Sequence, residues 1–292
     1  MRIGWLGLGA MGGPMAACLA RSGHQVHGYD VVPDRAAALA ADGVRPAASV
    51  AGAVAGADLT AIMVATPDQL EQVLFGPDGA AAALPTGSIV LIMATVGPAA
   101  VTSAASRLAG QGSTVLDAPV SGGVTRAAAG DLLIMVSGPA GAVQRAQPVL
   151  DSLARAAPVV GPAAGDGQRM KLVNQLLCGV HIAVAAEALA FAEALGLRPA
   201  DCWQVLRDGA AASFMFEDRG ARMVSGQFGD VRSALDIFVK DMGLVGAAAD
   251  DAGAATPLAR AAAWLYDRGH EEGLGRLDDS ALIEVLRAGR TI

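Results

Sequence analysis

Basic and aromatic residues are scarce in this chain of 292 residues. Phe, Trp and Tyr together make up 4% of it, and 21 Lys and Arg face 28 Asp and Glu, which gives a net charge of -7. Because no excess of basic charge is present to neutralise phosphates, we expect no nucleic-acid partner. Hydrophobic residues still make up 53% of the chain, which is long enough for two packed domains.

Cysteine is almost as scarce. The three cysteines, Cys18, Cys178 and Cys202, are widely spaced and include no C-x-x-C pair. An odd number at such spacing is not typical of a disulfide or zinc framework and suits a reducing compartment. His, Asp and Glu show no metal-ligand spacing either. We therefore expect a cytoplasmic protein that holds no metal and buries its thiols as small apolar groups.

A long uninterrupted apolar run is also missing. The longest candidate, 176–192, is interrupted by His181 and Glu187, and it is shorter than the roughly 20 residues that cross a bilayer. The first twenty residues could be interpreted as an export signal. Five glycines and Pro14 within 4–14 would break the helical core of such a signal. The sequence thus predicts neither a membrane span nor a leader.

The first thirty residues instead predict a βαβ unit built around a glycine-rich turn. A short apolar strand at 3–6 precedes Gly7-Leu8-Gly9-Ala10-Met11-Gly12, and a helix at 14–22 and a second strand at 25–30 follow. The second strand ends in Asp30, and an acidic residue about 20 positions after G-x-G-x-x-G is typical of dinucleotide binding. We predict that the six turn residues approach a pyrophosphate and that Asp30 accepts hydrogen bonds from a ribose of NAD.

The rest of the chain divides into two patterns. Strand candidates at 59–64, 88–93, 114–117, 132–137 and 158–160 alternate with alanine-rich helical stretches, which predicts a mostly parallel, doubly wound α/β sheet. After Gly165 the pattern is helical, at 167–195, 200–208, 232–252, 257–269 and 279–288. We predict a Rossmann-type NAD-binding domain at 1–163, a long linking helix, and an all-helical domain at 164–292 for substrate binding and oligomerisation.

Two further motifs carry candidate chemistry. Residues 117–123, DAPVSGG, follow a strand and can present the Ser121 hydroxyl and the amides of Gly122 and Gly123 to a carboxylate; an ordinary turn is the alternative. Residues 165–175, GDGQRMKLVNQ, place Lys171 and Asn174 on one face of a helix. Such a lysine can exchange a proton with an alcohol where burial lowers its pKa; a solvated lysine is the alternative.

In this order, and with VKDMGLV near Lys240, the motifs resemble the β-hydroxyacid dehydrogenase family over essentially the whole chain. The resemblance implies that Lys171 is the general acid and base and that Ser121, Gly122 and Gly123 hold the substrate carboxylate. It further implies substrate contacts from Asn174, Gln175 and Ser233, and cofactor contacts from Met63, Val64, Thr95 and Lys240. Cys18 and Gln175 stand where the family usually has asparagine.

The resemblance predicts an NAD-dependent dehydrogenase of a small hydroxy acid. The second half is similar to the branch that includes L-threonate dehydrogenase. Ser233 stands where several relatives have phenylalanine, and helical spacing predicts that it shares a face with Asp241. Oxidation of 3-hydroxyisobutyrate and reduction of tartronate or succinic semialdehyde are the alternatives. Lys171 argues against imine reduction and against a module without turnover, and the long apolar helix at 172–195 predicts a homodimer or homotetramer.

Overall fold

The computed structural model describes residues 1–289. By its internal contacts the chain forms two compact units, Met1–Lys171 and Leu172–Ile292, called unit 1 and unit 2 below. Each unit has a hydrophobic core. The boundary predicted from the sequence, between residues 163 and 164, lies eight residues before the boundary between the units, and it stays a prediction.

An eight-stranded sheet forms the centre of unit 1, in the order β11-β9-β6-β5-β4-β1-β2-β3. All neighbours in it pair in parallel except β6 and β9. Three short strands form a second sheet, β10-β8-β7. The strands are β1 (Arg2–Leu6), β2 (Gln25–Tyr29), β3 (Arg45–Pro46), β4 (Leu59–Ile62), β5 (Ile89–Ile92), β6 (Thr114–Asp117), β7 (Val120–Ser121), β8 (Leu132–Ile134), β9 (Val136–Ser137), β10 (Ala154–Ala156) and β11 (Val159–Gly161).

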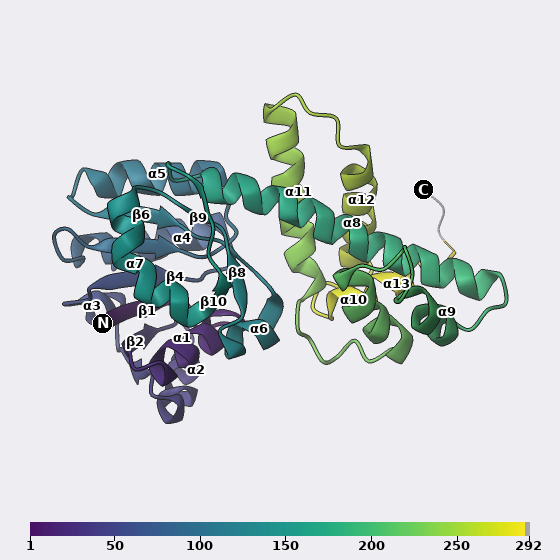
Figure 1. Ribbon diagram of the computed structural model, residues 1–292, viewed down its shortest axis with the longest axis horizontal. Coiled ribbons are helices and arrows are strands. Elements are labelled where there is room, and N and C mark those ends of the chain that lie inside the picture. Colours follow the sequence, from purple (N-terminus) through teal and green to yellow (C-terminus); the bar gives the residue numbers. More distant parts are fainter. Residues whose placement is uncertain (290–292) are drawn as a thin grey trace. The chain divides into compact units, whose positions relative to one another are not determined.

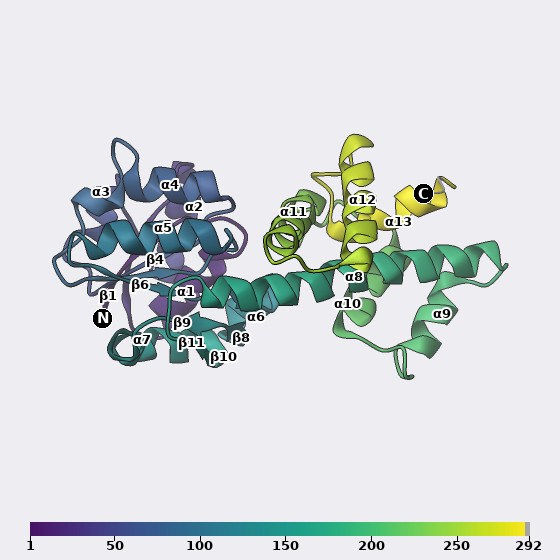
Figure 2. The same cartoon turned by 90° about the horizontal axis from the view of Figure 1, so that it is seen from above.

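Helices cover both faces of the large sheet, as the doubly wound prediction requires. Side chains of α1, α6 and α7 join one core cluster, and side chains of α3, α4 and α5 join another. Figure 2 shows α3, α4 and α5 on one side of the strands and α7 on the other. The helices of unit 1 are α1 (Gly12–Arg21), α2 (Pro33–Ala38), α3 (Val50–Val54), α4 (Pro67–Phe75), α5 (Pro98–Ala109), α6 (Gly123–Ala129) and α7 (Ala140–Leu153).

The predicted fold class is confirmed, and two details of the sheet differ. The stretch 132–137, predicted as one strand, forms β8 and β9 in different sheets. It divides at Met135, whose amide donates to the carbonyl oxygen of Pro119 rather than to a neighbouring strand of the large sheet. The strands β3, β7 and β10 have two or three residues each, which is too short for an alternating pattern to predict them.

Unit 2 is helical, and the described part of it contains no strand, as predicted. A long helix, α8 (Asp166–Ala194), begins in unit 1 and contributes to the core of unit 2, where α10, α11 and α12 gather around it (Figure 1). The remaining helices are α9 (Pro199–Leu206), α10 (Phe214–Ser225), α11 (Leu235–Asp251), α12 (Pro257–Glu271) and α13 (Leu282–Arg287). The helix α10 was not predicted from the sequence, although Ser213 caps it by accepting a hydrogen bond from the Phe216 amide at 3.0 Å.

By length and composition alone, α8 could cross a membrane, with a mean hydropathy of 1.7. The helix is, however, part of a protein core. Of its most apolar window, 44% is buried, and Ile182, Ala186 and Leu189 pack in the cluster of unit 2. One helix of this kind is weak evidence for a membrane span, because the core helix of a soluble protein passes the same test.

Candidate active site

The glycine-rich turn connects β1 to α1 at the carboxyl end of β1. Gly7 has a φ of 97°, and a Cβ at this residue would clash with the carbonyl oxygen of Met63, just after β4. A Cβ at Gly12 would clash with the carbonyl oxygen of Gly7. Both positions therefore require glycine. At Gly9 a Cβ would meet no heavy atom within 4 Å, so this side of the turn is open, as a cradle for a phosphate group requires.

The other residues of the turn have separate roles. Leu8 is buried and packs in the core of unit 1, whereas Ala10 is exposed. Met11 is half-buried and comes directly before the first residue of α1. The Leu8 side chain therefore anchors the turn in the core of unit 1. The backbone of the turn lies at the surface, where a dinucleotide can reach it. The sequence predicted all six residues, and their contact with a cofactor stays a prediction.

Asp30 follows β2 and is 7% exposed. Its Oδ2 accepts a hydrogen bond from the Leu8 amide at 2.7 Å, and its Oδ1 accepts one from the Val32 amide at 2.9 Å. Arg35 lies 3.2 Å from the same Oδ1 and is half exposed. The carboxylate therefore holds the glycine-rich turn in place. The cation beside it, Arg35, can attract the 2′-phosphate of NADP, so it affects the choice between NAD and NADP.

The ends of the neighbouring strands bring further candidates to the same edge of the sheet. Met63 and Val64 follow β4, and the Met63 amide donates to the carbonyl oxygen of Leu6 at 2.8 Å. Thr95 is half-buried and follows β5. Since β1, β4, β5 and β6 are parallel neighbours, their carboxyl ends lie at one edge. Open α/β sheets bind their ligands at this edge.

The Ser-Gly-Gly turn lies between β7 and α6. Ser121 is half-buried and pairs with Leu133 of β8, which fixes its backbone. Gly122 and Gly123 have φ values of 140° and 76°, conformations that only glycine adopts readily. The turn begins at Ser121, which ends β7 in the three-stranded sheet and lies four residues after Asp117, the last residue of β6. Its backbone is therefore a specific structure rather than a generic loop, while its role as a carboxylate site stays a prediction.

Lys171 lies in the second turn of α8 and is 6% exposed. Lysines are almost never buried to this extent unless their charge is compensated or lost. The solvated lysine that the sequence left open as an alternative is therefore wrong. Burial also singles Lys171 out among the cations of unit 1, of which Arg169, two residues earlier, has a side chain that is 65% exposed.

Two buried polar residues, one at the end of β6 and one in the first turn of α8, were not predicted as site residues from the sequence. Asp117 and Gln168 are both fully buried, and Gln168 Nε2 donates to Asp117 Oδ1 at 2.8 Å. Burial raises the pKa of the Asp117 carboxyl above its ordinary value of 3.8, against the opposing effect of hydrogen bonds from Gln168, Gly165 and Ser137. The only signal of this pair in the sequence was an aspartate at the end of a buried strand. That signal did not identify Gln168 as the partner of Asp117.

Unit 2 assembles its own polar cluster on α8 and α11. Gln175 Oε1 accepts a hydrogen bond from Asn174 Nδ2 at 2.8 Å, and Gln175 Nε2 donates to Asp241 Oδ2. Lys240 Nζ lies 2.7 Å from Asp241 Oδ1. The structure thus brings together Asn174, Gln175 and Lys240 through Asp241. Gln175 is 7% exposed and orients Asn174; its direct contact with a substrate stays a prediction.

Ser233 does not share a helical face with Asp241, so this prediction is wrong. The helix α11 begins at Leu235, so Ser233 precedes it. Here the chain is bound to a distant loop instead: the carbonyl oxygen of Ser233 accepts from the Asp279 amide at 2.7 Å, and the Ser233 amide donates to Asp278 Oδ2 at 3.3 Å. These contacts hold the backbone outside the helical conformation.

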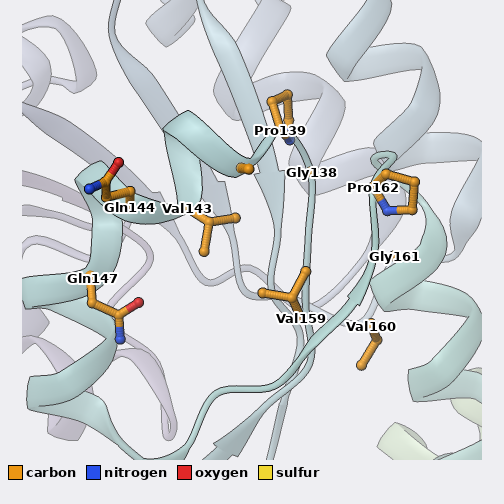
Figure 3. A pocket seen from close by; sticks show the side chains of 10 residues that line it. Gly138, Pro139, Val143, Gln144, Gln147, Val159, Val160, Gly161 and Pro162 are labelled. Carbon is orange, nitrogen blue, oxygen red and sulfur yellow. The ribbon is translucent and has the colours of Figure 1, made fainter.

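A separate hollow of about 680 Å³ lies on unit 1 and contains none of the predicted site residues. Figure 3 shows apolar side chains and two glutamines around it. Its lining residues are Gly138, Pro139, Ala140, Val143, Gln144, Gln147, Val159, Val160, Gly161 and Pro162. None of them titrates, so this hollow offers no acid, base or nucleophile. The predicted cofactor residues of unit 1 lie instead at the carboxyl ends of β1, β2, β4 and β5.

Comparisons with known proteins agree with this geometry. Residues 2–161 match the family described as the NAD binding domain of 6-phosphogluconate dehydrogenase. Residues 165–286 match the one described as the NAD-binding domain of NADP-dependent 3-hydroxyisobutyrate dehydrogenase. L-threonate dehydrogenase of Cupriavidus necator is 42% identical over 97% of this chain and 95% of its own length. For 2-hydroxy-3-oxopropionate reductase of Escherichia coli, the identity is 35% over 98% and 97%.

Solved structures give the same result. A crystal structure of 3-hydroxyisobutyrate dehydrogenase from Salmonella typhimurium is 38% identical, covers 97% of this chain and 99% of its own, and has a TM-score of 0.91. Psf3 in complex with NADP+ and 2-OPP is 26% identical over 97% and 99% of the two chains, with a TM-score of 0.89. Together with the glycine-rich turn, these matches show that the chain belongs to the β-hydroxyacid dehydrogenase family of oxidoreductases, which use a nicotinamide cofactor on hydroxy acids.

Proposed function

We propose that this chain is an NAD-dependent dehydrogenase that oxidises a four-carbon sugar acid such as L-threonate. The observation that supports this reaction class is the burial of Lys171 in the same unit as the dinucleotide turn. The identity of 42% with an L-threonate dehydrogenase supports the substrate. A second candidate, oxidation of 3-hydroxyisobutyrate, is favoured by the TM-score of 0.91 with a protein of that name.

The residues of unit 1 fit a bound dinucleotide. The open face at Gly9 and the close approach of backbone at Gly7 and Gly12 form a cradle in which amides can bond a pyrophosphate. Asp30 would hold the adenosine ribose, and Met63, Val64, Thr95 and Lys240 are the further expected cofactor contacts. When bound, the nicotinamide ring supplies the hydride acceptor of the oxidation.

The chain's own residues supply the remaining chemistry. The Ser121 hydroxyl and the amides of Gly122 and Gly123 hold the substrate carboxylate. Lys171, as the neutral amine, accepts the proton of the hydroxyl group that is oxidised, so that a carbonyl can form as the hydride leaves. Asn174, oriented by Gln175, and Ser233 contact the remaining polar groups of the substrate. A buried amine is shielded from competing water, which favours this transfer.

Cytoplasmic localisation and a homo-oligomer are also part of the proposal. Three cysteines without a disulfide suit a reducing compartment. On α8 and at the residue directly after it, five apolar side chains are each at least half exposed: Val173, Leu177, Val184, Phe191 and Leu195. Their spacing of four, seven, seven and four residues puts them in one stripe along the helix. A continuous exposed apolar stripe favours burial against a second copy of the chain.

Removing Lys171 should abolish turnover but not cofactor binding. Because a positioned acid and base contributes about a hundredfold to ten-thousandfold, Lys171→Ala should lower kcat by at least about a hundredfold. NAD affinity, measured by fluorescence titration, should stay near that of the wild type. Arg169→Ala, which removes an exposed cation two residues away, is the matched control and should keep its rate. A Lys171→Ala enzyme with most of its turnover would show that another group moves the proton.

The chain should prefer NAD to NADP. Two unit charges about 4 Å apart repel by ~4 kcal/mol at an effective dielectric of ~20, so Asp30 disfavours a 2′-phosphate. Solvent and the contact with Arg35 reduce this to about 2 kcal/mol, or about thirtyfold in kcat/KM. Arg35→Ala should widen the preference by removing a cation that can attract the phosphate. Equal kcat/KM for the two cofactors in the wild type would refute the assignment.

L-threonate should exceed 3-hydroxyisobutyrate in kcat/KM by at least about tenfold. A site that bonds substrate hydroxyls leaves its polar groups unpaired with an analogue that lacks them, at a cost of ~1–3 kcal/mol each. Parallel assays with the two acids measure the ratio. Ser233→Phe should reduce it, and an unchanged ratio would show that Ser233 selects nothing. A preference for 3-hydroxyisobutyrate would overturn the substrate while leaving the reaction class intact.

Light scattering should give a mass of two or four times the 29.1 kDa of one chain. Substitutions that introduce charges into the exposed apolar stripe should dissociate the assembly, because a buried unpaired charge is costly at an interface. The test variant is Val184→Glu with Phe191→Glu. The control is Leu258→Glu, at a residue that is 70% exposed on α12. A wild type of 29.1 kDa, or dissociation by the control alone, would contradict the proposal.

A further inference from the structure

Gln168 uses every hydrogen-bonding group of its side-chain amide. It lies in the first turn of α8 and is fully buried. Its Oε1 accepts hydrogen bonds from the amides of Val96, at 2.9 Å, and Gly97, at 3.0 Å. Its Nε2 donates to the carbonyl oxygen of Ala94 at 3.0 Å and to Asp117 at 2.8 Å. A flipped amide would set donors against donors and acceptors against acceptors at all four contacts, so one orientation is fixed.

Asp117 binds the start of α8 from the sheet. Its Oδ2 accepts from the backbone amides of Gly165, at 3.0 Å, and Gln168, at 2.9 Å. The neighbouring Ser137 Oγ accepts from the Gly167 amide at 2.9 Å. The first amides of a helix have no acceptor within the helix itself. Strand residues therefore provide the cap of α8, from positions 30 to 51 residues away in the chain.

These contacts connect two residues that the proposed function uses. Lys171 is three residues, or about one helical turn, after Gln168. Thr95, the predicted cofactor contact, lies between Ala94 and Val96, and both of these bond the Gln168 amide through their backbone. The same carboxylate, Asp117, ends β6, three residues before β7, from which the Ser121 turn departs. Movement of Asp117 or Gln168 would therefore shift the lysine and the Thr95 segment relative to each other.

We propose that Asp117 and Gln168 are positioning residues of the reaction, which lock the first turn of α8, and with it Lys171, to the Thr95 segment. This inference rests on the proposed function of Lys171 as acid and base. Neither residue needs to touch substrate or cofactor. Their effect on rate comes from geometry, since a displacement of about 1 Å at a reacting group can cost about a hundredfold in rate.

The test compares Gln168→Met and Asp117→Asn with the wild type. Gln168→Met keeps the volume and loses all four hydrogen bonds. Asp117→Asn keeps the shape and places one amide donor against another donor in either orientation. Both variants should lower kcat about tenfold to a hundredfold, with little change in KM for NAD. With substrate deuterated at the carbinol carbon, the isotope effect on kcat should grow, because a misplaced lysine slows the chemical step itself.

Ser113→Ala is the matched control. Ser113 is 4% exposed and bonds Ser88 at 3.0 Å, so this variant also removes a buried hydrogen bond of unit 1. It lies just before β6, at the opposite end of that strand from Asp117. A purely structural loss should lower the melting temperature and leave the turnover and isotope effect of the folded enzyme unchanged. Ser113→Ala should behave in this way, and the two test variants should not.

Amide hydrogen exchange supplies a readout that needs no turnover. In both test variants the amides of Gly165, Gly167 and Gln168 should exchange faster than in the wild type or in Ser113→Ala. If Gln168→Met does not fold, Asp117→Asn carries the test. Test variants with the control's kcat and isotope effect would overturn the inference and leave the proposed function standing. A wild type without hydroxy-acid turnover, or an active Lys171→Ala, would overturn both.

Discussion

The capping of α8 by a buried carboxylate is the constraint on which the site of unit 1 depends. A helix that starts inside a protein must find acceptors for its first amides, and Asp117 and Ser137 provide them at the ends of β6 and β9. The requirement is strict because an unpaired buried polar group is costly. It fixes where α8 begins against the sheet, and hence where Lys171 is placed.

Parallel pairing brings the other parts of the site to the same edge. The dinucleotide turn follows β1, Met63 follows β4, Thr95 follows β5, and the Ser121 turn comes shortly after β6. The pairing of the strands, rather than nearness in sequence, therefore brings residues from separate stretches to this edge. Unit 2 forms a polar cluster of its own, in which Asp241 connects Gln175 and Lys240.

The sequence predicts features that are encoded locally and misses those that depend on distant partners. Gly7 and Gly12 were identifiable because the G-x-G-x-x-G pattern lies within one turn of the chain, although the backbone that Gly7 approaches, at Met63, lies after β4 and could not be identified from it. Gln168 was not, since its partner Asp117 is 51 residues away and nothing in the spacing relates the two. Ser233 was misplaced for a similar reason. Helical periodicity continued through it, but Asp278, 45 residues later, holds its backbone in another conformation.

The central claim is that unit 1 directs a hydride from the carbinol carbon of a hydroxy acid to a nicotinamide ring. The most direct test uses a hydroxy acid deuterated at that carbon and nuclear magnetic resonance of the reduced cofactor after turnover. We expect deuterium at C4 of the nicotinamide, on one face only, since a chiral site binds the ring in one orientation. Reduced cofactor without deuterium, with the label released to water, would contradict the central claim.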